Sequence, residues 1–204
     1  EQGAPVDVYI SAGVEQAAAL ARQGLVDSAF VRTFAHNRLV LIAAALPSSQ
    51  VRDGDTARAT ADHAGGEGEI KERLELLRGP GFRHIAIASE ATAPAGRYAA
   101  RALRAAGLYD ALRPRLVPGA DVRHVLEYVA SGAAGAGFVY RTDALASDGV
   151  RIVLEIPVEM TGPVVYQMAL IAGSDHPKEA RELFEFLSSA PVRDLLRKRG
   201  FDAD

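Results

Sequence analysis

The segment HIAIASEATAPAGRYAARALR, residues 84–104, decides the fold class that this sequence predicts. It begins with an apolar run at residues 84–88, which favours a buried strand. After Pro94 it continues into a stretch that favours a helix ending near Arg104. Proline suits the first turn of a helix because its φ angle is already helical. A strand that leads into a helix is the repeating unit of α/β proteins.

The same alternation of strand and helix extends over the rest of the chain. Strands are predicted at residues 6–10, 38–44, 137–140, 150–154 and 164–171, and helices at residues 14–23, 70–77, 121–130, 177–187 and 191–200. The run at residues 38–44 is almost entirely apolar, as expected of a strand that helices cover on both faces. We therefore expect an α/β fold with mostly parallel sheets, and the number of strands allows two lobes.

The composition is that of a globular chain and excludes several classes of protein. The 204 residues are 49% hydrophobic and 24% charged, with 23 Lys and Arg against 26 Asp and Glu. This balance gives no electrostatic footprint for duplex nucleic acid, which is not an expected partner. The absence of cysteine excludes thiol and zinc-thiolate chemistry. No apolar run approaches the ~18 residues of a membrane-spanning helix, and residues 1–5 do not have the pattern of a signal peptide.

Two predicted helix starts have features of an anion-binding site. Ala95 and Gly96 follow Pro94 at a helix opening, where small side chains let a ligand approach free backbone N–H groups. An ordinary helix start, packed tightly against the sheet, is the alternative at this position. Asp121 is a good N-cap for the helix that begins at Val122, and the N–H groups of that first turn also point outward.

Tyr140 ends the short predicted strand at residues 137–140, so its hydroxyl would lie at the carboxyl end of a strand. In open α/β sheets this edge is where ligands bind. A core tyrosine with a satisfied hydroxyl is equally compatible with the spacing.

The sequence has no pattern typical of catalysis, nucleotide binding or metal binding. It lacks a GxSxG elbow, a GxxxxGK[ST] phosphate loop and a GxGxxG segment after a strand. The histidines form no HxxxH pair and have no carboxylate at ligand spacing; they are His36, His63, His84, His124 and His176. We therefore expect no enzyme activity, no cofactor and no metal ion held directly by side chains.

Five segments together point to a known family. They are GAPVDVYISA at residues 3–12, NRLVL at 37–41, APAGRYA at 93–99, DVR at 121–123 and GFVY at 137–140. In order and spacing they resemble the periplasmic molybdate-binding proteins of ABC importers. Residues 184–187 and 200–201 also resemble the closing helix of that family. The resemblance extends over the chain except for a polar, Gly-, Asp- and Ser-rich insertion at about residues 47–69.

This resemblance implies a two-lobed type II periplasmic-binding-protein fold. Residues 1–44 and 172–204 would form the first lobe, and residues 45–171 the second. The oxyanion would lie in the cleft between the lobes, held by hydrogen bonds and not by ion pairs.

The resemblance also implies which residues bind the ligand. Ala95 and Val122 would donate backbone N–H groups, and Tyr140 would donate its hydroxyl. The implied function is that of a monomeric, periplasmic or otherwise extracytoplasmic protein. It would bind molybdate or tungstate as a ligand and present it to ABC permease subunits.

The chain departs from the family pattern at its start. Members of the family have a further β-α-β stretch before the position that matches Gly3, with two serine-bearing loops that complete the ligand shell, and this stretch is not in the sequence. The first lobe is therefore expected to be incomplete. Two alternatives stay open: a molybdate-sensing domain of a transcription regulator, and a truncated homologue that binds nothing.

Overall fold

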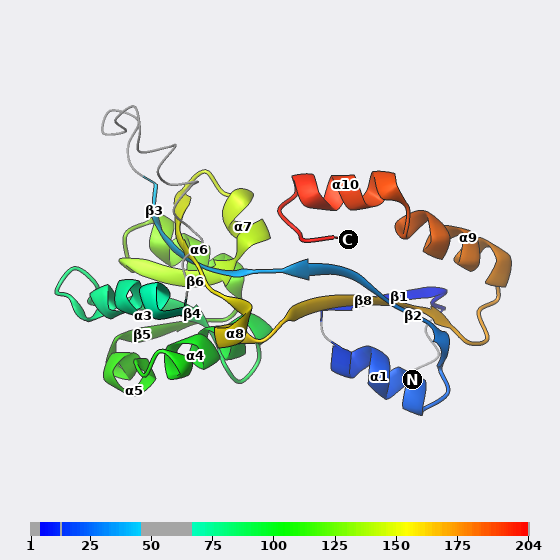
Figure 1. Ribbon diagram of the computed structural model, residues 1–204, viewed down its shortest axis with the longest axis horizontal. Helices are drawn as coiled ribbons and strands as arrows, with labels where there is room; N and C mark the ends of the chain where they lie inside the picture. The colour runs from blue at the N-terminus through cyan, green and yellow to red at the C-terminus, as the bar shows by residue number, and fades with distance from the viewer. Residues whose placement is uncertain (1–4, 13, 46–66, 204) are drawn as a thin grey trace. The chain divides into compact units, whose positions relative to one another are not determined.

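The computed structural model describes residues 5–12, 14–45 and 67–203 (Figure 1). The chain divides into two compact units. Unit 1 consists of Glu1–Asn37 with Val164–Asp204, and unit 2 consists of Arg38–Pro163. The chain therefore passes from unit 1 into unit 2 and back again.

Unit 1 is built on a three-stranded sheet with the order β1-β8-β2. The strands are β1 (Val8–Ala12), β2 (Val26–Asn37) and β8 (Val164–Ile171). β8 lies between β1 and β2 and runs antiparallel to both, so a strand from late in the sequence is at the centre of this sheet. The chain end returns to the same sheet, where His36 and Asp202 exchange two backbone hydrogen bonds.

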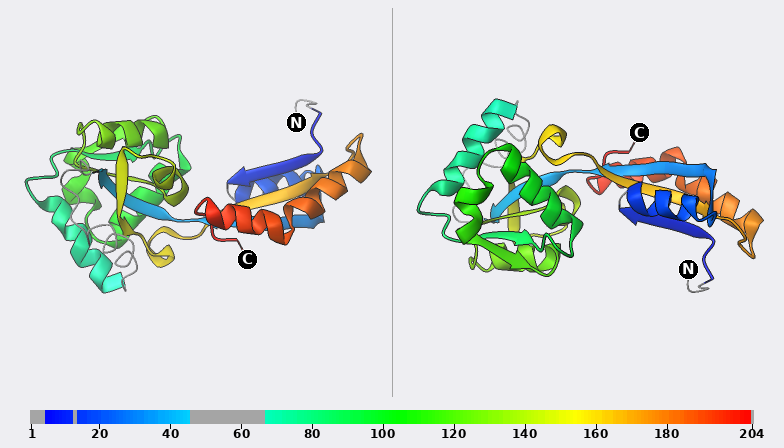
Figure 2. Two further views of the ribbon diagram at one scale, coloured as in Figure 1. Left: turned by 90° about the horizontal axis from the view of Figure 1, so that it is seen from above. Right: turned by 90° about the horizontal axis from the view of Figure 1, so that it is seen from below.

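Helices cover both faces of the sheet in unit 1. They are α1 (Val14–Arg22), α9 (Pro177–Leu187) and α10 (Ala190–Lys198). Figures 1 and 2 show α1 on one face and α9 and α10 on the other. Gly24 follows α1 with a φ of 71°, a left-handed conformation that ends the helix at low energetic cost only for glycine.

Unit 2 is built on a five-stranded sheet with the order β5-β4-β6-β3-β7. These strands are β3 (Leu39–Ala44), β4 (Ile85–Ala88), β5 (Leu116–Gly119), β6 (Ala136–Tyr140) and β7 (Val150–Glu155). β4 runs parallel to β5 and to β6, whereas β3 runs antiparallel to β6 and to β7. The parallel part of the sheet is thus confined to three adjacent strands.

The helices of unit 2 connect these strands. They are α3 (Glu67–Glu75), α4 (Pro94–Ala105), α5 (Tyr109–Leu112), α6 (Val122–Ala130), α7 (Arg141–Leu145) and α8 (Val158–Thr161), with the 3-10 turns η2 (Leu76–Arg78) and η3 (Arg113–Arg115).

Two apolar clusters lie on opposite faces of this sheet, because successive residues of a strand point to opposite sides. Leu39 and Leu41 of β3 belong to the cluster that includes Leu74 of α3 and Leu103 of α4. Their neighbours Val40 and Ile42 belong to the second cluster, which includes Val125 and Val129 of α6. All four β3 residues are buried, so the prediction of a strand covered on both faces is confirmed.

The expected α/β class is confirmed, but the expectation of mostly parallel sheets is wrong. Only β4 with β5 and β4 with β6 pair in parallel among the described strands. The division into units also differs from the expected lobes. Residues 39–44 pair within unit 2 and residues 164–171 within unit 1, because β3 bonds to β6 and β7 while β8 bonds to β1 and β2.

The predicted polar insertion lies largely outside the described residues. Its last part is described and begins the helix α3, which starts at Glu67 and not at the predicted residue 70.

Candidate functional site

The candidate site lies in unit 2, at the carboxyl ends of the three parallel strands. Ala88 at the end of β4 is in register with Gly119 at the end of β5, and β6 lies on the other side of β4. A helix starts shortly after each of these strands: α4 after β4, α6 after β5 and α7 after β6. This edge therefore gathers several helix N-termini, whose backbone N–H groups have partial positive charge.

The first helix start leaves a backbone donor unused. Ala93 precedes α4 in an extended conformation, and its side chain makes no capping bond. Its carbonyl oxygen accepts hydrogen bonds from the N–H groups of Gly96 at 3.1 Å and Arg97 at 3.4 Å. Within the described part of the chain, the N–H of Ala95 makes no hydrogen bond. Ala95 is 2% exposed, and its methyl side chain adds little bulk beside this donor.

Gly96 allows α4 to approach the end of β4 closely. A Cβ atom at this position would lie 2.1 Å from the carbonyl oxygen of Ala88 and 2.7 Å from the carbonyl carbon of Ser89. Since both atoms belong to the backbone, neither can move aside cheaply. Glycine at position 96 therefore allows the start of α4, with the N–H of Ala95, to lie close to the end of β4.

At the second helix start, that of α6, the capping side chain bonds two backbone N–H groups and leaves a third without an acceptor. The Asp121 Oδ1 atom accepts hydrogen bonds from the backbone N–H groups of Arg123 at 2.9 Å and His124 at 3.1 Å. These bonds, together with the side chain of His124, hold the pKa of Asp121 below its usual value. Among the described residues nothing accepts from the N–H of Val122. The prediction that Asp121 is the N-cap is confirmed, and the backbone N–H of Val122 is left available to a ligand.

Tyr140 ends β6 and is half-buried between two elements of the same edge. Its ring meets the ring of Tyr98 from α4 edge to face, with centroids 6.4 Å apart and an interplanar angle of 65°. The hydroxyl of Tyr98 donates to the carbonyl oxygen of Pro163 at 3.3 Å, which holds this second ring in place. Tyr140 is therefore partly buried and packs against Tyr98 and the apolar cluster.

The three residues expected from the sequence lie on one apolar cluster. Ala95 is a buried member of the cluster that contains Val125 and Val129, and Val122 and Tyr140 pack against it. The structure therefore brings together residues that are far apart in the sequence. What it adds is Tyr98, which the sequence reasoning did not single out, although it follows Ala95 by the three-residue spacing of one helix face.

Charged groups also surround this edge. Burial raises the pKa of Asp143 in the first turn of α7, while Arg123 lowers it and Asp121 raises it. Glu155 accepts from Arg141 at 3.3 Å and lies 3.7 Å from Arg38. Neither Asp143 nor the pairing of Glu155 with Arg141 and Arg38 was expected from the sequence, because these contacts depend on helix packing and strand pairing.

Among the described residues there is neither a metal-ligand cluster nor a membrane-spanning helix. No cluster of three or more His, Cys, Asp or Glu side chains is placed to hold a metal ion in the described parts of either unit. None of the helices described is both long enough and apolar enough to span a bilayer. The chemistry that the edge offers is donation of hydrogen bonds, which suits a bound anion.

Comparison with known proteins finds relatives of this chain. The ModA molybdate-binding protein of Haemophilus influenzae is 32% identical over 203 residues, which are 100% of this chain and 73% of that protein. The lipoprotein YvgL of Bacillus subtilis is 39% identical over 120 residues, 59% of this chain and 46% of that protein, so the aligned part spans less than half of YvgL. A solved substrate-binding domain from Clostridium difficile matches with a TM-score of 0.78 and 29% identity, covering 100% of this chain and 79% of that one.

The fold of unit 1 and unit 2 is thus that of a periplasmic-binding protein of type II. The model of the family described as bacterial extracellular solute-binding protein matches residues 1–202. This chain belongs to the bacterial extracellular solute-binding protein family.

Proposed function

We propose that this chain is an extracytoplasmic solute-binding protein that captures molybdate or tungstate for an ABC importer. The observation that supports it most directly is the pair of unused N–H groups of Ala95 and Val122 beside Tyr140, at one edge of unit 2. The name of the Haemophilus relative, a molybdate-binding protein, supports the choice of ligand.

The donor set suits a tetrahedral oxyanion. Each oxygen of such an anion accepts several hydrogen bonds, and helix N-termini stabilise negative charge without a buried Lys or Arg. Molybdenum or tungsten would then be held only through its oxygen atoms, with no side chain as a metal ligand. The ligand is bound and released unchanged, so the proposed role is binding and not catalysis.

The proposed partners follow from the family. The loaded protein would present its anion to ABC permease subunits as a monomer, and nucleic acid has no role. The assignment to an extracellular solute-binding family favours transport over the sensing domain of a transcription regulator.

The experiment that tests this proposal removes one backbone donor. Val122 is the first residue of α6, and Asp121 before it is extended, with φ −149° and ψ −174°. Both conditions suit proline, so Val122→Pro can fold; it removes that N–H donor and also replaces the valine side chain. Val122→Ala is the matched control, since it trims the same side chain and keeps the N–H.

Isothermal titration calorimetry with molybdate, tungstate and sulfate gives the result. We expect wild type and Val122→Ala to bind molybdate and tungstate in preference to sulfate. Val122→Pro should bind about 1.5–3 kcal/mol more weakly, the range for a hydrogen bond to a charged group. Absence of molybdate binding by the wild type contradicts the proposed ligand. Equal affinity of the proline and alanine variants removes Val122 from the site.

A further inference from the structure

Unit 1 contains a pocket that is lined only by its own residues, apart from the proposed oxyanion site in unit 2. Its volume is about 210 Å³. The apolar part of its wall comes from three side chains of two strands and one helix: Phe34, Met168 and Leu187. The polar part comes mainly from Arg32, Ser188 and Arg193, and no carboxylate lines the pocket.

Arg32 is held in a fixed position at this pocket. Its Nη1 atom donates to Glu185 Oε2 at 3.1 Å and to Ser188 Oγ at 3.2 Å. Its guanidinium also lies over the ring of Phe184, with the Cζ atom 4.9 Å from the ring centroid. Ser188 is fixed in turn, because its hydroxyl donates to the carbonyl oxygen of Phe184 at 3.0 Å. A guanidinium that is already oriented loses little entropy when it binds a ligand.

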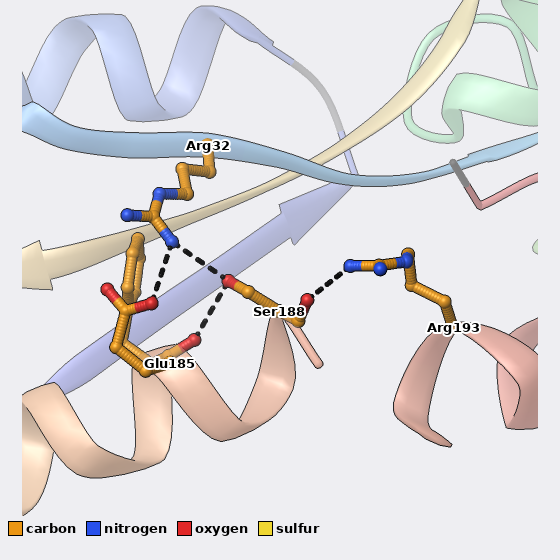
Figure 3. A network of polar contacts seen from close by, with 5 residues as sticks. Arg32, Glu185, Ser188 and Arg193 are labelled. Atoms are coloured by element: carbon orange, nitrogen blue, oxygen red, sulfur yellow. Dashed lines mark hydrogen bonds and ion pairs between the residues drawn. The ribbon is translucent and has the colours of Figure 1, made fainter. Parts of the chain in front are cut away.

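Arg193 enters the same cluster from the next helix. It donates from Nη1 to the carbonyl oxygen of Ser188. Figure 3 shows Arg32 and Arg193 reaching Ser188 from opposite sides. Within the described residues no carboxylate lies at ion-pair distance from Arg193. The side chain is only partly exposed, so solvent does not fully hydrate its charge.

The charges of the cluster leave one positive charge unmatched. Arg32 and Arg193 supply two guanidinium groups, and Glu185 supplies one carboxylate, which is paired with Arg32. One monoanion would neutralise the remainder. Thr33 also lines the pocket and adds a hydroxyl that can donate to such an anion.

We propose that this pocket binds a small organic carboxylate with a short apolar tail. The planar guanidinium matches the geometry of a carboxylate, and the buried Met168 and its neighbours accommodate the tail. The volume is below the ~300 Å³ at which pockets for drug-sized molecules begin, so the ligand has few heavy atoms. This second site lies in unit 1 and does not depend on the proposed oxyanion site in unit 2.

The two methionines of the chain make this proposal testable by NMR. Met168 lines the pocket, whereas Met160 is a buried core residue of unit 2. The probe is sodium butyrate, added to protein with ¹³C-labelled methionine methyl groups. The two signals are assigned with Met168→Leu. We expect a saturable shift of the Met168 signal in the millimolar range and no shift of the Met160 signal.

Two arginines on one helix provide the variant and its control. Arg193→Gln removes the unmatched charge and should weaken butyrate binding about tenfold or more. Arg197→Gln is the control, because this exposed residue of α10 pairs with Asp194 at 3.0 Å outside the pocket and should leave the titration unchanged.

Three outcomes would overturn the proposal. The first is no shift of the Met168 signal up to about 20 mM butyrate, a concentration far above the dissociation constant expected of a useful ligand of this size. The second is the same movement with sulfate or chloride, which would mean that the pocket has no preference for an organic carboxylate. The third is an unchanged titration in Arg193→Gln.

Discussion

At the scale of single residues, the proposed anion binding depends on which backbone donors the capping groups leave unused. Asp121 accepts from the N–H groups of Arg123 and His124 but not from that of Val122. The carbonyl oxygen of Ala93 accepts from Gly96 and Arg97 but not from Ala95. Each helix start thus satisfies its later donors internally and leaves an early one without an acceptor among the described residues.

Tyr140 tests whether a side-chain hydroxyl completes the proposed shell. Tyr140→Phe removes the hydroxyl and retains the ring that contacts Tyr98. We predict a loss of about 0.5–1.5 kcal/mol in molybdate affinity, or more if the anion's charge strengthens the bond. Calorimetry would measure it, with Tyr128→Phe in α6 as the matched control. An affinity equal to that of the wild type would remove Tyr140 from the site.

Asp143 gives a prediction about stability and pH. Burial raises the pKa of its carboxyl, with Arg123 lowering and Asp121 raising it. A raised folded-state pKa means that the neutral form stabilises the fold below the unfolded pKa, and that this contribution is lost as pH rises through the folded pKa. Asp143→Asn should therefore raise Tm at pH 7, and the gain should vanish as pH falls below 3.8, the ordinary value.

Thermal melts from pH 3 to 8 would measure this difference. The control is Asp148→Asn, which changes an exposed aspartate in the loop after α7. A gain in Tm for Asp143→Asn that is equally large at every pH would mean that desolvation of the charged carboxyl is not its cause.

The two helix starts could be predicted from the sequence because their pattern is local, whereas the ligand-binding roles of Ala95, Val122 and Tyr140 come from the family resemblance and stay a prediction. Pro94 and Ala95 mark one helix start, and Asp121 and Val122 mark another, within a few residues of sequence. Tyr140 was singled out because it ends a short predicted strand. Arg141 with Glu155, and Asp143 with Arg123, could not be found in this way, because β-strand pairing and helix packing bring them together.

At the scale of elements, the turn between β4 and α4 is fixed from both sides. Glu90 in this turn accepts a hydrogen bond from the hydroxyl of Tyr109 and pairs with Arg104 at 3.0 Å. Arg104 also lies over the Tyr109 ring, with its Cζ atom 4.0 Å from the centroid. The same bond to Glu90 raises the pKa of Tyr109. Gly96 then lets the helix close onto the strand end.

This close approach predicts the effect of one added methyl group. Gly96→Ala would place its Cβ within 2.1 Å of the Ala88 carbonyl oxygen, so the helix start must move. We predict a loss of about 2–3 kcal/mol in the free energy of unfolding, measured by urea denaturation, and weaker anion binding. Gly68→Ala in α3 is the control, since its Cβ would meet nothing within 4 Å. Equal stability of the two variants would contradict the close packing.

Elements with strong periodicity were predicted, and one long element was missed. The sequence predicted β3, β4 and α4 nearly at their observed bounds. It gave no sign of β2, whose twelve residues are mostly exposed or half-buried and so have no clear apolar alternation. The prediction of mostly parallel sheets was wrong because the apolar pattern of a buried strand is the same whether its neighbours are parallel or antiparallel.

At the scale of the whole molecule, ligand binding should raise the stability of the folded chain. At ~100 times the dissociation constant, a ligand that binds only the folded state adds about 2.7 kcal/mol. We predict a rise in Tm of about 5–10 °C with sodium molybdate, at ~2–4 °C per kcal/mol for a chain of this size. Sulfate and chloride at equal ionic strength should give no such rise. A cooperative melt that molybdate does not move would exclude tight binding by this chain.

The central position of β8 has a consequence for the order in which the chain is completed during synthesis. β1 and β2 are made early, but each finds its hydrogen-bonding partner only when Val164–Ile171 leaves the ribosome. All strands of the sheet in Arg38–Pro163 are made before that point. The larger sheet can therefore form first, while β1 and β2 remain unpaired and open to misassociation until β8 has been made.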